Sequence, residues 1–212
     1  MLDAFFCRAT PEERAAALPG DADMPDPVAV LDHAIDVAAP PQAVWPWLAQ
    51  MGAYPRAGWY SWDCLDNRGH RSLRVIDPAL TEIAVGSIFP ALPGVADCFI
   101  LTAFEENRFL LLAVPGPHGP KGEPGSGEWR RSFDRSSWTW MLAPAAGGTR
   151  IHVRARLGWL ETDLPILGTV AFPAPLARLI ARPVHFVMQQ RQLRNIRRRV
   201  ETGRRAGTRD TD

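Results

Sequence analysis

The chain has 212 residues, of which 46% are hydrophobic and 22% are charged, and its formal net charge at pH 7 is +1. This length and balance are typical of one globular domain whose core is large enough to need neither disulfides nor metals. No uninterrupted apolar run reaches the roughly 18 residues that a membrane-spanning helix needs, which argues against a transmembrane protein.

The start of the chain and its cysteines bear on the compartment. The stretch MLDAFFCRATPEERAAALPGD has an early acid and a charged, helix-like run where a signal peptide would have a continuous apolar core. Cys7, Cys64 and Cys98 are odd in number and lack C-x-x-C spacing, so they indicate neither a disulfide framework nor a zinc site. We therefore expect a cytoplasmic protein.

Residues 1–27 are expected to be an N-terminal extension with one short helix. Thr10 can cap this helix, Pro11 suits its first position, and Pro19-Gly20 ends it. The next segment, VLDHAIDV, alternates in the manner of a half-buried strand. APPQAVWPWLAQMG then predicts a short helix, because Pro46 lies within its first turns.

The stretch PRAGWYSWDCLDNRG, residues 55–69, is unusually rich in aromatic rings. Helical spacing places its rings and polar tips on two adjoining faces, with Tyr60, Asp63 and Asn67 on one and Trp59, Trp62 and Asp66 on the other. Such mixing suits the wall of a binding cavity with a few placed polar groups. The alternative is structural: Asp63 pairs with an arginine such as Arg56, and the rings fill the core.

Beyond Gly69 the chain turns strand-rich, with extended runs in EIAVGSIFP, DCFILTAFEENRFLLLAVP and RSSWTWMLAPAAGGTRIHVRARLGW. The turn residues between these runs predict antiparallel hairpins. In the last two runs an apolar face is expected to point inward, comprising Trp138, Trp140, Leu142, Ile151, Val153, Ala155 and Leu157. VPGPHGPKGEPGSGEW is expected to be a mobile surface loop.

The segment LPILGTVAFPAPLARLIARPVHFVMQQRQLRNIRRRVETG predicts a long helix, broken near Pro173, Pro175 and Pro183. Its apolar stripe and the apolar face of the sheet each need a cover. The predicted architecture is therefore α+β: a curved antiparallel sheet wrapped around a long C-terminal helix, with two short helices after the first strand. The domain would span residues 28–203, followed by a disordered basic tail, 204–212.

This order of elements resembles the helix-grip fold of the START-like, or SRPBCC, superfamily. The segments LPGD, APPQAVWPWLAQMG, RAGWYSWDCLDN, VGSIFP and HFVMQQRQLRNIRRRVE look like a bacterial branch grouped with polyketide cyclase/dehydrase and lipid-transport relatives. The resemblance covers roughly residues 10–201. It implies a cavity between sheet and long helix that binds a hydrophobic or aromatic small molecule, lipid- or polyketide-like, and it implies no particular reaction.

In such a cavity the expected ligand-binding residues come from four places. They are Trp59, Tyr60 and Asp63 at the entrance, Phe99 and Leu101 (or their alternates) on the sheet floor, Trp138 and Trp140 on a later strand, and Met188 on the helix. Rings supply large apolar contact, and a buried indole N–H needs a partner, which a ligand can provide.

A cyclase- or dehydratase-like enzyme is the alternative function, and it needs a general acid or base in the pocket. Asp63 is the leading catalytic candidate, with Tyr60, Asp66 and His185 behind it. The five histidines lack metal-ligand spacing, and no nucleotide-binding or serine-hydrolase motif is present. We therefore expect neither a metal nor another cofactor.

Charge is distributed unevenly along the chain. From Arg178 onward there are ten arginines and three acids, whereas residues 1–177 carry more acids than bases. A basic C-terminal end can make weak contact with anionic membranes, so a lipid-handling module at a membrane surface is a third possibility. A solvated helix face explains the same arginines, and no specific nucleic-acid partner is expected.

Overall fold

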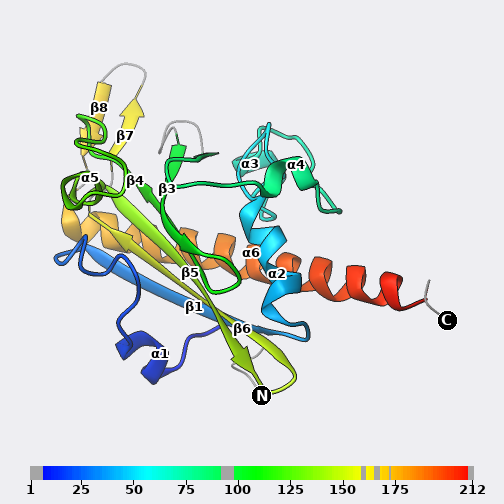
Figure 1. Ribbon diagram of the computed structural model, residues 1–212. Helices are drawn as coiled ribbons and strands as arrows, with labels where there is room; N and C mark the ends of the chain where they lie inside the picture. Colours follow the sequence, from blue (N-terminus) through cyan, green and yellow to red (C-terminus); the bar gives the residue numbers. More distant parts are fainter. Residues whose placement is uncertain (1–6, 92–97, 159–160, 165–167, 172, 210–212) are drawn as a thin grey trace.

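The computed structural model describes residues 7–91, 98–158, 161–164, 168–171 and 173–209. Most strands form one antiparallel sheet in the order β1-β6-β5-β4-β3-β2. These are β1 (Ala29–Val37), β2 (Ile88–Pro90), β3 (Cys98–Glu105), β4 (Phe109–Val114), β5 (Ser136–Ala145) and β6 (Gly148–Leu157). A hairpin of β7 (Glu161–Leu164) and β8 (Gly168–Ala171) projects from one end of the molecule (Figure 1).

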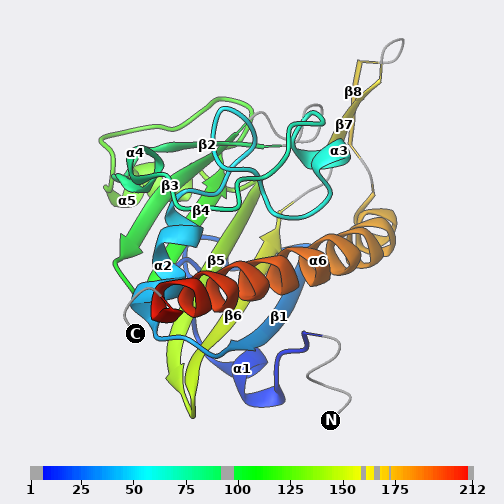
Figure 2. The same ribbon diagram turned by 90° about the vertical axis from the view of Figure 1, so that its right-hand side faces the viewer.

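One long helix covers one face of the sheet. The helices are α1 (Pro11–Ala15), α2 (Pro41–Ala49), α3 (Asp63–Asp66), α4 (Pro78–Thr81), α5 (Gly127–Arg131) and α6 (Ala174–Arg209). Figure 2 shows α6 lying across β5, β6 and β1, with α2 beside its C-terminal half. This confirms the predicted helix-grip α+β architecture. Among the described residues no helix is both long and apolar enough to cross a membrane.

Several local expectations need correction. Three short helices, α2, α3 and α4, follow the first strand instead of two. α6 runs unbroken through Pro183, whose exposed position lets water reach the backbone carbonyl that the proline leaves unbonded. The helix also continues to Arg209, across most of the predicted tail. The Gly- and Pro-rich segment contains α5, which Ser126 caps and which buries Trp129 against the sheet.

The face of the sheet under α6, called the inner face here, holds the apolar core. Its members from the sheet and α6 include Ile35, Val37, Leu101, Leu110, Leu112, Trp140, Leu142, Ile151, Val153, Leu193, Ile196 and Val200. The predicted inward set on β5 and β6 is confirmed for Trp138, Trp140, Leu142, Ile151 and Val153. Ala155 and Leu157 are only partly buried and lie outside this core.

The opposite, outer face carries the polar half of the same alternation. Arg154 is 3% exposed, and its guanidinium donates to Asp32 and Asp21 at 2.8 and 2.7 Å and to backbone carbonyls in and after α1. Arg156 donates to the carbonyl of Met24, and Arg150 to Glu13. The segment before β1 is therefore fastened across the outer face by arginines of β6.

Replacing Arg154 by Met should lower the free energy of unfolding by about 3 kcal/mol, because it leaves the buried Asp32 carboxylate without its guanidinium partner. Urea unfolding measures the loss. Arg108→Met is the control, since Arg108 and its partner Glu105 are exposed and such pairs contribute less than about 1 kcal/mol. Equal, small losses in both variants would show that the fastening contributes little to stability.

Candidate ligand-binding site

The stretch 55–69 is mostly an irregular loop, so its rings do not follow helical spacing. Only Asp63–Asp66 is helical, and Tyr60 has a φ of +60°. Trp59 and Tyr60 are 4% and 1% exposed, whereas Trp62 is exposed and lies 3.9 Å from the guanidinium of Arg191. The predicted two faces are wrong because residues 55–62 are not helical and Tyr60 has a left-handed backbone conformation.

Glycine is required at position 58 for this loop to close. Gly58 has a φ of +88°, and a Cβ there would overlap the side chain and backbone of Ser72. Its N–H donates to the carbonyl of Gly52 at 2.7 Å. This packing holds Trp59, the next residue, against the sheet, where its indole N–H donates to the carbonyl of Pro90 at 3.0 Å.

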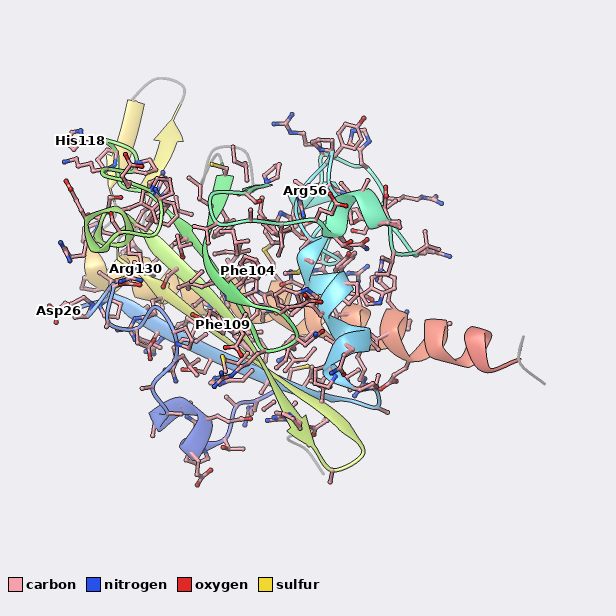
Figure 3. All side chains as sticks on the ribbon, in the orientation of Figure 1. Asp26, Arg56, Phe104, Phe109, His118 and Arg130 are labelled. Carbon is pink, nitrogen blue, oxygen red and sulfur yellow. The ribbon has the colours of Figure 1, made fainter. Side chains whose placement is uncertain are left out.

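Asp63 fastens the same loop. Its carboxylate accepts hydrogen bonds from both the backbone N–H and the hydroxyl of Ser72. Arg56, which the sequence offers as a partner for Asp63, instead donates to the carbonyls of Ala49, Met51 and Leu80. Figure 3 places Arg56 at the end of α2, beside α4.

Four rings meet on the inner face and form what we call the inner cluster: Trp59, Phe99, Trp138 and Trp140. The centroid of Trp138 lies 5.4 Å from those of Trp59 and Phe99 and 5.2 Å from that of Trp140. Trp140 is fully buried, whereas Phe99 and Trp138 are only partly buried. The cluster therefore has an open side.

A pair of histidines borders the cluster. His33 of β1 and His185 of α6 stack with centroids 5.2 Å apart, and Nδ1 of His185 lies 3.3 Å from Nε2 of His33. The His185 ring also contacts the edge of Trp138, with centroids 6.0 Å apart. Burial lowers the pKa of His33 to about 4 and that of His185 to about 3, so both imidazoles are neutral near pH 7.

Polar atoms without partners lie among these rings. Within the described residues, the indole N–H groups of Trp138 and Trp140 and the side-chain oxygen of Gln189 make no hydrogen bond. Gln189 is 1% exposed, and its amide nitrogen donates to Gln192. Buried polar atoms are nearly always paired, so the two unpaired indole N–H groups of the cluster, and the unpaired Gln189 oxygen one helical turn from His185, require an explanation.

The structure brings together four of the predicted residues, namely Trp59, Phe99, Trp138 and Trp140. Leu101 lies beneath them in the core, and the hydroxyl of Tyr60 accepts a hydrogen bond from Gln50. Met188 is partly buried on α6, one residue before Gln189, and its carbonyl accepts from Ser61.

Sequence reasoning missed His33 and Gln189. His33 falls on the apolar side of the alternating segment VLDHAIDV, and Gln189 lies one helical turn after His185. Both signals were available from the sequence. In the described part of the chain no group of three or more His, Cys, Asp or Glu side chains is placed to hold a metal ion.

A surface pocket of about 550 Å³ lies elsewhere and shares no residue with the inner cluster. Its walls include Trp45 and Phe104, whose rings stack at 6.1 Å, and the carboxylates of Glu82 and Glu106. Figure 3 shows Phe104 on β3. Its rim is exposed, and no buried polar atom without a partner belongs to its lining among the described residues.

Asp66 on α3 is a buried carboxylic acid. It is 1% exposed, one of its oxygens accepts from the N–H of Trp62 at 3.3 Å, and within the described residues the other has no partner. Burial raises its pKa to about 6. Its buried environment thus favours the protonated, uncharged form of the carboxylic acid.

Asp66→Asn should change how stability depends on pH. Because the folded-state pKa lies above the unfolded value of about 3.9, ionisation opposes folding, so wild-type stability falls as pH rises from about 4 through 6. The variant should gain on the order of 3 kcal/mol relative to the wild type between pH 4 and 7.5, measured by urea unfolding. The exposed Asp26→Asn is the control; curves for Asp66→Asn that parallel the wild type would refute the assignment.

Similarity to known proteins is confined to solved structures. No protein-family model matches the chain, and no curated protein matches it. A protein from Nitrosomonas europaea is 13% identical, with a TM-score of 0.48 over 88% of this chain and 99% of its own. An AHSA1-like protein from Aeromonas hydrophila is 16% identical, with a TM-score of 0.38 over 82% and 94%. A Polyketide_cyc-like protein from Corynebacterium glutamicum is 15% identical, with a TM-score of 0.32 over 63% and 68%.

At these identities the likeness concerns the fold alone.

Proposed function

We propose that the protein binds a hydrophobic or aromatic small molecule, lipid- or polyketide-like, between the inner face of the sheet and α6. The observation that carries this proposal is that the indole N–H groups of Trp138 and Trp140 are unpaired within a cluster of rings, with the unpaired Gln189 oxygen one helical turn from His185. A purely structural core would have apolar side chains there or would pair these atoms.

The free-energy cost of leaving buried polar atoms without hydrogen bonds favours the binding of a small molecule. Leaving a buried donor or acceptor unpaired costs about 1–3 kcal/mol. Three such atoms therefore lower the free energy of unfolding by an amount that is large relative to the total stability of an ordinary domain. A guest that pairs even one of them recovers part of this cost. The neighbouring rings add apolar contact, which is the main source of affinity for small molecules in protein cavities.

The partly exposed side chains at the edge of the inner cluster are where such a ligand would first make contact. Trp140 in the cluster and Gln189 on α6 are buried. Phe99 and Trp138 in the cluster, and His185 beside it, are partly exposed. All of these lie on the inner face or on the side of α6 that meets it. An apolar molecule can therefore contact the border rings first and reach the polar atoms behind them.

Trp138→Ala should weaken binding of the neutral fluorescent probe N-phenyl-1-naphthylamine at least about tenfold, because the ring is the centre of the cluster and such contacts contribute more than 1 kcal/mol. Fluorescence titration gives the affinity. Trp62→Ala is the matched control, since Trp62 is exposed and packs on Arg191.

Phe99→Ala provides a second test that leaves every indole in place, and unfolding curves confirm that each variant is folded. If the probe does not bind the wild type, or binds Trp138→Ala and Phe99→Ala as tightly as the wild type, the site is not the inner cluster.

A further inference from the structure

The unpaired atoms of the inner cluster constrain the chemistry of the guest. Trp138 and Trp140 each offer one N–H, and Gln189 offers one carbonyl oxygen. An indole nitrogen donates and never accepts. The cluster therefore presents more donors than acceptors, and its first requirement is a guest atom that accepts hydrogen bonds.

Strand register places these atoms around the histidine pair. Trp140 pairs with Val153 in the β5–β6 ladder, and Val153 pairs with His33 in the β6–β1 ladder, so Trp140 and His33 lie at the same level of the sheet. His33 contacts His185, and Gln189 follows His185 by one helical turn. Trp138 contacts the same His185 ring.

Among the described residues, the cation–π contacts involve Phe89, Trp62 and Tyr60, and none joins a charged side chain to a ring of the inner cluster. In the described part of the chain, the ring contacts of Trp138 and Trp140 are all with other aromatic or imidazole rings. The nearby charges Asp32 and Arg154 belong to the outer face, where they pair with each other. His33 and His185 are held neutral by burial, as described above.

A charged head group would therefore be poorly tolerated. Moving an ionised carboxylate or ammonium out of water without a partner of opposite charge costs several kcal/mol. A neutral carbonyl or hydroxyl oxygen loses far less hydration and accepts from an indole N–H, a net gain of about 1 kcal/mol per bond.

We propose that the guest is an uncharged molecule with an apolar or aromatic body and a carbonyl or hydroxyl oxygen, which accepts from the indole N–H groups of Trp138 and Trp140. Free carboxylates and ammonium compounds of the same size are excluded. This inference rests on the proposed function and specifies the substrate class of the same site.

Naphthalene and three 2-substituted naphthalenes of similar size test the inference at pH 7.5: 2-acetylnaphthalene, 2-naphthoate and 2-(aminomethyl)naphthalene. Each competes with N-phenyl-1-naphthylamine for the wild-type protein. The ketone should bind about fivefold tighter than naphthalene, the worth of one neutral hydrogen bond. The carboxylate and the ammonium compound should bind at least about tenfold more weakly than the ketone.

Two conservative variants assign the donors. Trp138→Phe and Trp140→Phe keep a ring and delete the N–H, so at least one of them should reduce the advantage of the ketone over naphthalene to less than about twofold, with naphthalene binding nearly unchanged. Trp129→Phe is the control, because Trp129 is a buried indole of α5 in the separate cluster with Ala113 and Phe133.

The outcomes separate the two proposals. If 2-naphthoate or the ammonium compound binds as tightly as the ketone, or if both Phe variants keep the full advantage of the ketone, the inferred substrate class is wrong while the binding site stands. If neither the probe nor any naphthalene binds the wild type, the proposed function is wrong and this inference falls with it.

Discussion

The guanidinium of Arg154 is the interaction on which the two-sided character of the sheet depends. It is almost fully buried on the outer face, where Asp32, Asp21 and carbonyls of the N-terminal segment pair its N–H groups. The N-terminal segment thus pairs the arginines of the outer face, although the buried Ser137 hydroxyl of that face has no partner among the described residues. On the inner face the fully buried Trp140 has an unpaired N–H. What distinguishes the inner face is that its unpaired indoles belong to a cluster of rings in mutual contact.

The two halves of α6 present different kinds of side chain to the sheet. Its C-terminal half carries Leu193, Ile196 and Val200, all buried in the core, and this half holds the helix on the sheet. Its N-terminal half presents His185 and Gln189 instead, next to the inner cluster. On the proposed function, the turns of α6 that hold it on the sheet differ from the turns that would face the ligand. Binding sites commonly depart in this way from the rules that the rest of a domain obeys.

Much of the fold could be predicted from the sequence, because alternation in β5 and β6 and the apolar stripe of α6 are strong periodic signals. The N-cap at Thr10 was equally readable, and the structure shows Thr10 capping α1 in a capping box with Glu13. The loop around Trp59 was not, since a left-handed turn at Tyr60 and the close approach of Gly58 to Ser72 depend on tertiary contacts. Trp59, Phe99, Trp138 and Trp140 were expected in one place, and they meet. The histidine pair was missed because His33 and His185 are 152 positions apart.

An uncharged ligand in the inner cluster should remain bound during gentle purification, so mass spectrometry of the native protein detects it directly. The expected result is a mass above that of the chain, released on denaturation as a neutral apolar compound that contains oxygen, and absent from Trp138→Ala purified in the same way. A wild-type protein that shows only its own mass, even after incubation with N-phenyl-1-naphthylamine and 2-acetylnaphthalene, would contradict it.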